Sequence, residues 1–146
     1  MSQAARAIII EDGKILVMYR NKYGSDYYTL VGGRVNDGET TEQALVREVM
    51  EETGLQVISA RPVFIEDHPA PYNAQVIFLC DIGPHTNVKI QDSSEEGVLN
   101  YLGANVHQPQ WVALNTFAKL PFRTPQLQAA IITALQKGFP ADPQQL

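Results

Sequence analysis

The sequence predicts an α/β fold in which a mixed β-sheet lies between helices. Strand-like runs rich in β-branched and aromatic residues stand on both sides of one central helical segment, and a second helical segment follows near the end of the chain. Strands interrupted by one helix and closed by another are typical of a sheet with helices on both faces. The 146 residues contain no internal repeat and no linker, so residues 1–146 are expected to form a single domain.

Strands are expected before and after the central helix. In chain order they are Ala5–Ile10, Lys14–Arg20, Tyr27–Val31, Leu55–Glu66, Ala74–Ile82, a short one around Val98–Leu102, and Gln110–Leu114. The sequence Glu11-Asp12-Gly13 is a hairpin signal between the first two strands, and the polar stretch 21–26 is expected to be a loop.

The C-terminal part of the chain is expected to be helical. A helical turn over Leu114–Leu120 is followed by a helix over Thr124–Lys137, which Gly138 ends. The tail after residue 139 is expected to be flexible, because terminal residues rarely make enough contacts to hold one conformation.

The central helix is expected over Thr41–Thr53, where no glycine or proline interrupts the chain. Thr40 followed by Gln43 forms a capping-box pattern at its start. Gly54 provides the left-handed residue that commonly ends a helix. The turn signal at 36–38 (Asn-Asp-Gly) precedes the helix.

This helix is expected to have an acidic face and an apolar face. The charged side chains lie within an arc of about 140°, and they are Arg47, Glu48, Glu51 and Glu52. The opposite, apolar side is expected to consist of Leu45, Val46, Val49 and Met50. Ala44 is expected among the charged side chains, where its small size leaves room for a ligand to approach.

The acidic face is unfavourable for the helix itself. Carboxylates in the last turns oppose the helix dipole, at about 0.3–1 kcal/mol each, and Glu48 repels both Glu51 and Glu52, which Arg47 offsets only in part. Violations of this kind tend to mark functional sites. A divalent cation would turn the repulsion into attraction, and carboxylate oxygens suit Mg²⁺. A solvated acidic face is the alternative, but the turn, cap, arginine and glycine in register favour a metal site.

Composition excludes several other classes of protein. The net charge of −5 and the lack of a basic patch argue against long nucleic acid as a partner. A single cysteine, Cys80, excludes an internal disulfide and is expected to be a buried small hydrophobe. The apolar run near the N-terminus is too short for a signal peptide or a membrane span. We therefore expect a cytoplasmic protein without a membrane partner, as a monomer or homodimer.

The stretch from Gly33 to Leu55 has the spacing G-x5-E-x7-R-E-U-x-E-E-x-G-U, where U is a bulky apolar residue. It resembles the Nudix box, the signature of the Nudix hydrolases, at every position. The likeness extends to Arg20 before the box and to Trp111-Val112 near the C-terminus. One departure is Val31, since many members have proline before the two glycines. The resemblance implies a Nudix-type α/β/α sandwich.

The resemblance also implies a reaction. Nudix enzymes hydrolyse the pyrophosphate bond of a nucleoside diphosphate linked to another group X, such as a nucleoside triphosphate or ADP-ribose, by attack of water on phosphorus. They use Mg²⁺, and Mn²⁺ can replace it. The partner would therefore be a small-molecule nucleotide.

Roles for individual residues follow from the same resemblance. The metal ligands would be Glu48, Glu51, Glu52 and the carbonyl of Gly32, and the catalytic residues Arg47, Glu48 and Glu51. Arg47 would pair with Glu51 and hold it in place. Glu39 would brace the preceding loop, a structural role.

The general base and the substrate contacts stay open at this point. Glu48 activates the water in some branches of the family, and a carboxylate from a later loop does so in others; Glu95 and Glu96 are the loop candidates for the base or for an extra metal ligand, or they are solvated acids. The residues suited to meet the substrate are Arg20 and Arg34 for phosphate and Tyr28 for stacking on a base.

Two other functions share this fold. A nucleotide-sensing module would have lost catalysis, but such modules usually lose box acids and none is missing here. An isopentenyl diphosphate isomerase would need catalytic groups outside the box, against which a single core-like cysteine counts. The substrate cues contradict each other, because Pro71 fits the ADP-ribose branch and Tyr72 the dinucleoside polyphosphate branch, and both can be loop residues.

Overall fold

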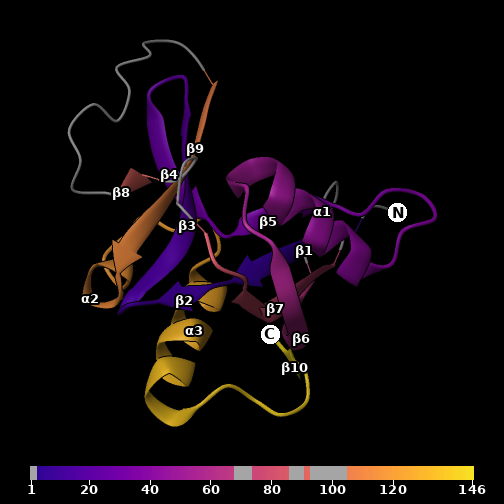
Figure 1. The fold of residues 1–146 in the computed structure, drawn as a ribbon. Helices are drawn as coiled ribbons and strands as arrows, with labels where there is room; N and C mark the ends of the chain where they lie inside the picture. Colours follow the sequence, from indigo (N-terminus) through magenta and orange to yellow (C-terminus); the bar gives the residue numbers. More distant parts are fainter. Residues whose placement is uncertain (1–2, 68–73, 86–90, 93–104) are drawn as a thin grey trace.

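The computed structural model describes residues 3–67, 74–85, 91–92 and 105–146, and these form two β-sheets and three helices (Figure 1). The strands of the mixed sheet are, in spatial order, β10 (Gln144–Gln145), β6 (Val57–Glu66), β7 (Gln75–Ile82), β1 (Ala4–Ile8) and β5 (Val31–Arg34). The second sheet has the order β2 (Ile10–Glu11), β3 (Lys14–Lys22), β9 (Asn105–Ala113) and β8 (Gln91–Asp92), and β4 (Ser25–Thr29) also pairs with β3.

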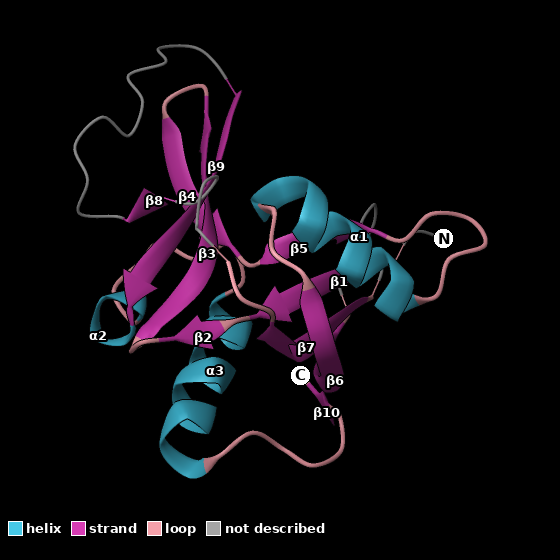
Figure 2. Ribbon diagram, viewed as in Figure 1, coloured by secondary structure: helices cyan, strands magenta, loops and turns pink. Residues whose placement is uncertain are grey.

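Helices cover both faces of the mixed sheet, so the predicted α/β/α arrangement is confirmed. Strand β1 runs parallel to β7 and antiparallel to β5, which makes this sheet mixed. Helix α1 (Thr41–Thr53) and helix α3 (Pro125–Lys137) lie on opposite sides of it (Figure 2), and the short helix α2 (Leu114–Phe117) follows β9. Alternate residues of β1 divide between the two cores, with Ala7 on the α1 side and Ile8 on the α3 side. The second sheet was not distinguished in the sequence.

Helix α1 begins and ends where the sequence predicted. The Thr40 hydroxyl accepts a hydrogen bond from the Gln43 amide at 3.1 Å, and the Gln43 side chain accepts one from the Thr40 amide at 2.9 Å. Gly54 is left-handed with φ of 79°. These local bonds satisfy backbone groups that the helix itself leaves unpaired.

The buried face of α1 is rotated from the predicted one. Leu45 and Val49 are buried as expected, but Val46 and Met50 are 41% and 43% exposed, and Ala44 is fully buried instead of lying among the charged side chains. The helix packs against β1 and β5, and the small Ala44 side chain allows a close approach there. The expected apolar face was therefore wrong at Val46 and Met50, and the open position expected for Ala44 was wrong as well, because the helix turns its acidic edge toward β5.

The expected loop 21–26 is part of a hairpin instead. Strands β3 and β4 stay paired up to Lys22 and Ser25, and the turn between them consists of Tyr23 and Gly24, both with positive φ. The polar residues at this tip are mostly solvent-exposed, so their polarity reflects exposure and not a lack of pairing. The expected hairpin at Asp12-Gly13 is confirmed, and both residues have positive φ.

The C-terminal tail differs from the expected flexible segment. Gln144–Gln145 form β10, which pairs in parallel with β6, and the Leu146 amide donates to the Ile65 carbonyl at 2.9 Å. Strand β6 would otherwise be an edge strand with unpaired backbone groups, which the tail covers. The strand expected around 98–102 lies outside the described residues. No helix in the described part of the chain is long and apolar enough to cross a membrane.

Candidate functional site

The predicted acidic cluster lies where α1 packs against the edge strand β5. The Gly32 amide donates to Glu52 Oε1 at 2.8 Å. A Cβ atom on Gly33 would lie 2.6 Å from Cδ of Glu48, and one on Gly32, whose φ is +139°, would lie 2.0 Å from the Ala5 carbonyl oxygen. Glycine at position 33 therefore allows the Glu48 carboxylate to approach the strand, and glycine at position 32 allows β5 to lie against β1 at a positive φ.

Arg47 connects most of the other charged groups. Its guanidinium makes two bonds of 2.8 and 2.9 Å to the Glu39 carboxylate. It also lies 3.0 Å from Glu48 Oε1 and 3.4 Å from Glu51 Oε2, and donates to the Arg34 carbonyl at 3.1 Å. The predicted contact with Glu51 is therefore present, but it is the longest of the set. Arg47 ties the helix to the loop before it and to the end of β5.

Glu39 has the geometry of a loop brace, as the sequence indicated. Its carboxylate accepts the two Arg47 bonds and a third from the Asn36 amide at 2.9 Å. The Arg47 guanidinium first, and the Asn36 amide second, lower the pKa of Glu39 to about 2. Glu39 is therefore ionised at any pH at which the protein would act, and it fixes the side chain of Arg47.

The three glutamates can offer oxygen atoms to a cation. The hydrogen bonds of the described residues engage Oε1 of Glu48, Oε2 of Glu51 and Oε1 of Glu52, which leaves one oxygen of each for a ligand. Glu51 is 59% exposed and Glu48 only 18%. In the described part of the chain no three His, Cys, Asp or Glu groups already stand in a metal-holding arrangement. The donor set fits Mg²⁺ chemically, but the carboxylates would have to turn toward a shared ion.

Glu52 is the most perturbed carboxylate of the cluster. Burial raises its pKa to about 7, and the negative charge of Glu48 acts in the same direction. The Gly32 amide bond and the guanidiniums of Arg6 and Arg20 act in the opposite direction. A divalent cation between Glu48 and Glu52 would offset the repulsion between their negative charges.

Arg6 belongs to the site although the sequence did not indicate it. Its Nη1 atom donates to the Gly32 carbonyl at 2.9 Å and, more weakly, to the Leu30 carbonyl at 3.3 Å. Burial lowers the pKa of Arg6, and Glu52 counteracts this. The Gly32 carbonyl, predicted as a metal ligand, therefore accepts a hydrogen bond from Arg6 in the structure.

A second group of side chains lies beside the acidic cluster on the second sheet. Arg20 on β3 faces His107 on β9, with 3.0 Å between Nη2 and Nε2. Two guanidiniums lie against the ring of Tyr27, with the Cζ atoms of Arg20 and Arg123 at 5.5 and 5.8 Å from its centroid. Arg20 was predicted to meet the substrate, and the structure places it near Glu52, whose pKa it lowers. Tyr27, His107 and Arg123 were not predicted.

Tyr28, the predicted stacking residue, lies on the other face of its strand. Its ring packs against Tyr19 with centroids 5.4 Å apart, and it borders the core on the α3 side. Successive residues of a strand point to opposite faces, so Tyr27 and not Tyr28 accompanies Arg20.

The remaining predicted residues divide into three cases. Arg34 is exposed at the end of β5, where its carbonyl binds Arg47. The loop candidates Glu95 and Glu96, and the substrate cues at 71 and 72, lie outside the described residues. Cys80 is buried as expected, and burial raises the pKa of its thiol to about 12, which suits a core residue and not a nucleophile.

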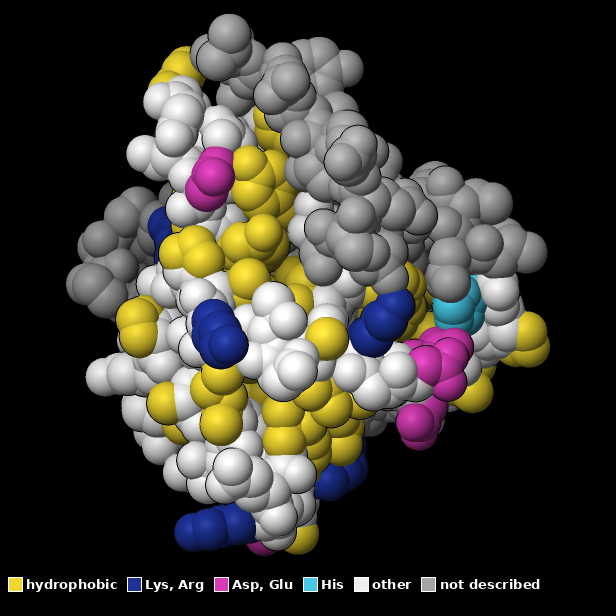
Figure 3. All heavy atoms as spheres, turned by 90° about the vertical axis from the view of Figure 1, so that its left-hand side faces the viewer, with side chains coloured by type: hydrophobic (Ala, Val, Ile, Leu, Met, Phe, Trp, Pro, Cys, Tyr) yellow, Lys and Arg dark blue, Asp and Glu magenta, His cyan; other side chains and the backbone are white. Residues whose placement is uncertain are grey.

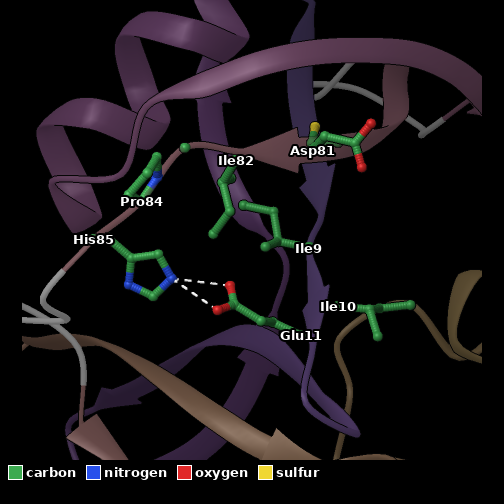
Figure 4. Close-up of a pocket in the computed structure, with 9 residues that line it drawn as sticks. Ile9, Ile10, Glu11, Asp81, Ile82, Pro84 and His85 are labelled. Carbon is green, nitrogen blue, oxygen red and sulfur yellow. Dashed lines mark hydrogen bonds and ion pairs between the residues drawn. The ribbon is translucent and has the colours of Figure 1, made fainter.

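A separate hollow of about 560 Å³ opens at the ends of β1 and β7 (Figure 4). In it, Nε2 of His85 lies 2.9 Å from a Glu11 carboxylate oxygen, and the His85 ring stacks on Trp111 with 6.2 Å between centroids. Its other lining residues are Ile9, Ile10, Cys80, Asp81, Ile82, Gly83 and Pro84. None of the box carboxylates lines this hollow.

The surface charges are dispersed on the face shown in Figure 3. Among the side chains drawn in colour there, Lys and Arg stand apart from one another between hydrophobic and neutral groups. The described residues of that face therefore form no continuous basic surface of the kind that binds long nucleic acid.

Comparison with known proteins identifies the family. The model of the NUDIX domain matches residues 1–135, and the chain belongs to this family. Solved structures with a similar fold include an E. coli protein called ORF135 (TM-score 0.66, 26% identity, 97% of this chain and 95% of that one). An ADP-ribose pyrophosphatase from Streptococcus suis (TM-score 0.65, 22% identity, 99% and 98% of the two chains) shares the fold as well. The predicted family and fold class are confirmed.

Curated relatives match over a shorter region. An NAD-capped RNA hydrolase, NudC, from Edwardsiella ictaluri is 39% identical over 82 residues, which is 54% of this chain and 32% of that protein. A NudC protein from Pectobacterium atrosepticum is 38% identical over 68 residues, covering 47% and 26%. The chain thus spans about a third or less of the length of these relatives.

Glu52 predicts a pH dependence of stability in the absence of metal. Its folded pKa of about 7 lies above the ordinary 4.5, so the folded state binds the proton more tightly than the unfolded state. The resulting stabilisation is complete below pH 4.5 and is lost as the pH rises through 7. With a chelator present, the melting temperature of the wild type should fall more between pH 5 and 8 than that of Glu52→Gln. Parallel melting curves would contradict the perturbed pKa.

The two glycines predict different outcomes when replaced by alanine. In Gly33→Ala the new methyl group meets only the flexible end of Glu48, so the fold should persist while Mn²⁺ affinity falls about tenfold or more, as for other changes that displace a ligand. In Gly32→Ala the methyl group meets backbone at a positive φ, so the melting temperature itself should fall. Calorimetric titration and thermal melts measure both. Unchanged Mn²⁺ affinity in folded Gly33→Ala would show that Glu48 is not a ligand in this position.

Proposed function

We propose that the protein is a Mg²⁺-dependent Nudix pyrophosphohydrolase that cleaves the pyrophosphate bond of a nucleotide by attack of water on phosphorus. The observation that carries this proposal is the acidic cluster of α1, held against β5 by the Gly32 amide and Arg47. Every acid of the box is present and clustered there, and the chain belongs to the NUDIX domain family. Mn²⁺ would support the reaction as well.

The chain's own residues explain how such a reaction would be supported. Glu48, Glu51, Glu52 and the Gly32 carbonyl would hold the metal, which when bound neutralises phosphate oxygens and makes a bound water more acidic. Arg47 orients Glu48 and Glu51 through its Nη1 atom. Glu39, ionised and bonded twice to Arg47, keeps that guanidinium in place. Arg6 holds the Gly32 carbonyl at the edge of the site.

The substrate would be a small nucleotide with a pyrophosphate linkage. The relatives named NudC act on NAD-capped RNA by their names. The pyrophosphate linkage of such a cap is of the kind proposed for the substrate of this chain. A pyrophosphate can approach three carboxylates only with cations between them, which the metal and the neighbouring arginines would provide.

Two alternative functions are less well supported. A nucleotide sensor without catalysis would not require all three box glutamates, and they are all present. A diphosphate isomerase would require a reactive thiol, whereas Cys80 is buried and its thiol has a pKa raised to about 12. Formation of the two phosphate-bearing products of pyrophosphate cleavage, measured for a panel of nucleotides with Mg²⁺, separates the hydrolase from both.

Glu52 provides the test of the metal site. Glu52→Gln keeps the shape of the side chain but removes a charge from the ligand set, so kcat should fall about 100-fold or more. The control is Glu42→Gln, which changes an exposed acid in the first turn of the same helix and should leave kcat unchanged. Near wild-type turnover by the purified Glu52→Gln variant would defeat the assignment.

Glu48 provides the test of the general base. If Glu48 accepts the proton of the attacking water, Glu48→Gln should depress kcat strongly while KM changes little. If a loop acid does so, Glu95→Gln or Glu96→Gln should show that pattern, and the Glu48 change should weaken metal binding instead. Full recovery of the Glu48→Gln rate at high Mg²⁺ would show that Glu48 is a ligand and not the base.

A further inference from the structure

We propose that Arg20, Arg123 and Tyr27 form a subsite for a phosphate group that lies outside the metal-bound pyrophosphate. This inference rests on the proposed function, because the subsite adjoins the box carboxylates. It narrows the substrate class to nucleotides that carry at least one phosphate more than the two of the cleaved linkage.

The geometry begins with the pairing of β3 and β4, which places Arg20 directly opposite Tyr27. Arg123 comes from the segment before α3, and its amide donates to the Tyr28 carbonyl at 2.9 Å, which fixes its backbone beside β4. Both guanidiniums then lie within 6 Å of the Tyr27 ring centroid. The ring attracts each of them through its electron-rich face and so holds two like charges in one place.

These cations lie next to the acidic cluster. Arg6 bonds to the Gly32 carbonyl at 2.9 Å. Arg6 and Arg20 lie close enough to attract the Glu52 carboxylate, and Arg20 and Arg123 lie close enough to Arg6 to repel it. Three of the chain's 11 Lys and Arg residues therefore share one region, in a protein whose net charge is −5. Such a concentration of positive charge beside a metal site suits an anion.

The charge of Arg20 is not cancelled by its partner in the structure. Its Nη2 atom faces Nε2 of His107, and burial together with Arg20 lowers the pKa of His107, which keeps that ring neutral as an acceptor. Within the described part of the chain, the Nε atom of Arg20 is buried and has no hydrogen-bond partner. Among the described residues Arg20 makes no ion pair with a carboxylate, so a buried guanidinium donor remains for a ligand.

A phosphate fits this subsite better than a base does. Tyr27 already has two guanidiniums against its ring, whereas planar guanidiniums bind phosphate oxygens with paired donors. The pyrophosphate at the metal has its own cation, so a further phosphate would need separate positive groups. That phosphate can be the terminal group of a nucleoside triphosphate or a phosphodiester next to a capped end, and both offer the same oxygens.

Kinetics with three substrates test the proposal. The substrates are a nucleoside triphosphate, ADP-ribose and a short NAD-capped oligonucleotide, of which only ADP-ribose lacks the additional phosphate. In Arg123→Gln, kcat/KM for the triphosphate, for the oligonucleotide or for both should fall about 10- to 100-fold, mainly through KM, and the loss for ADP-ribose should be at least tenfold smaller. A loss with the triphosphate identifies the terminal phosphate as the bound group, and a loss with the oligonucleotide identifies the phosphodiester. Equal losses for all three substrates, or none, would overturn the proposal.

Matched variants separate charge from geometry. Arg123→Lys keeps the charge but loses the paired donors, and should recover only part of the loss. Arg61→Gln removes an exposed arginine whose guanidinium binds the Pro140 carbonyl, and should leave the substrate ratio unchanged.

Binding of inorganic phosphates tests the subsite without turnover. By calorimetric titration with Mg²⁺ present, the wild type should bind tripolyphosphate more tightly than pyrophosphate, and Arg123→Gln should lose most of this difference. If the protein hydrolysed no nucleotide, the proposed function would be wrong. The binding measurement would still test the subsite, because it does not depend on turnover. Equal affinity of the wild type for the two phosphates would refute the subsite on its own.

Discussion

The close contact between α1 and the edge strand β5 is the interaction on which the rest of the site depends. The Gly32 amide binds Glu52, and Gly33 leaves the space that the Glu48 carboxylate occupies, while Gly32 lets β5 approach the backbone of β1. Ala44 is buried on this helix in the same core cluster as Ala5 and Val31, and its small side chain suits a close approach. Without that approach the same acids would be a solvated helix face, and Glu52 would not be buried enough for its pKa to rise.

Positive groups around this contact make a cluster of like charges tolerable. Arg47 lies on the solvent side of the acidic cluster, where it binds Glu39, Glu48 and Glu51. Arg6 and Arg20 lie on the buried side of the cluster, near Glu52. These groups do not offset the burial of Glu52, whose pKa stays raised to about 7. A divalent cation would complete the compensation, and the additional arginines would meet substrate charge.

The sequence predicted those parts of the structure that depend on neighbouring residues. The limits of α1 and its capping box were correct because each depends on contacts within one or two turns. Tyr27 was missed because a Tyr-Gly pair is a weak turn signal, since tyrosine seldom has positive φ. Had the β3–β4 hairpin been recognised, its register would have placed Tyr27 opposite Arg20. Arg6 and Arg123 reach the site only through strand pairing across the fold, which no local pattern indicates.

The most direct test of the central claim, that the acidic face of α1 binds a divalent cation, is the effect of Mg²⁺ on thermal stability. A cation that binds only the folded state raises the melting temperature by mass action. The melting temperature of the wild type should therefore rise between chelator and about 10 mM Mg²⁺, a concentration chosen well above an ordinary dissociation constant. The variant with Glu48, Glu51 and Glu52 all changed to Gln should not respond. Identical melting curves of the wild type with chelator and with Mg²⁺ would contradict the claim.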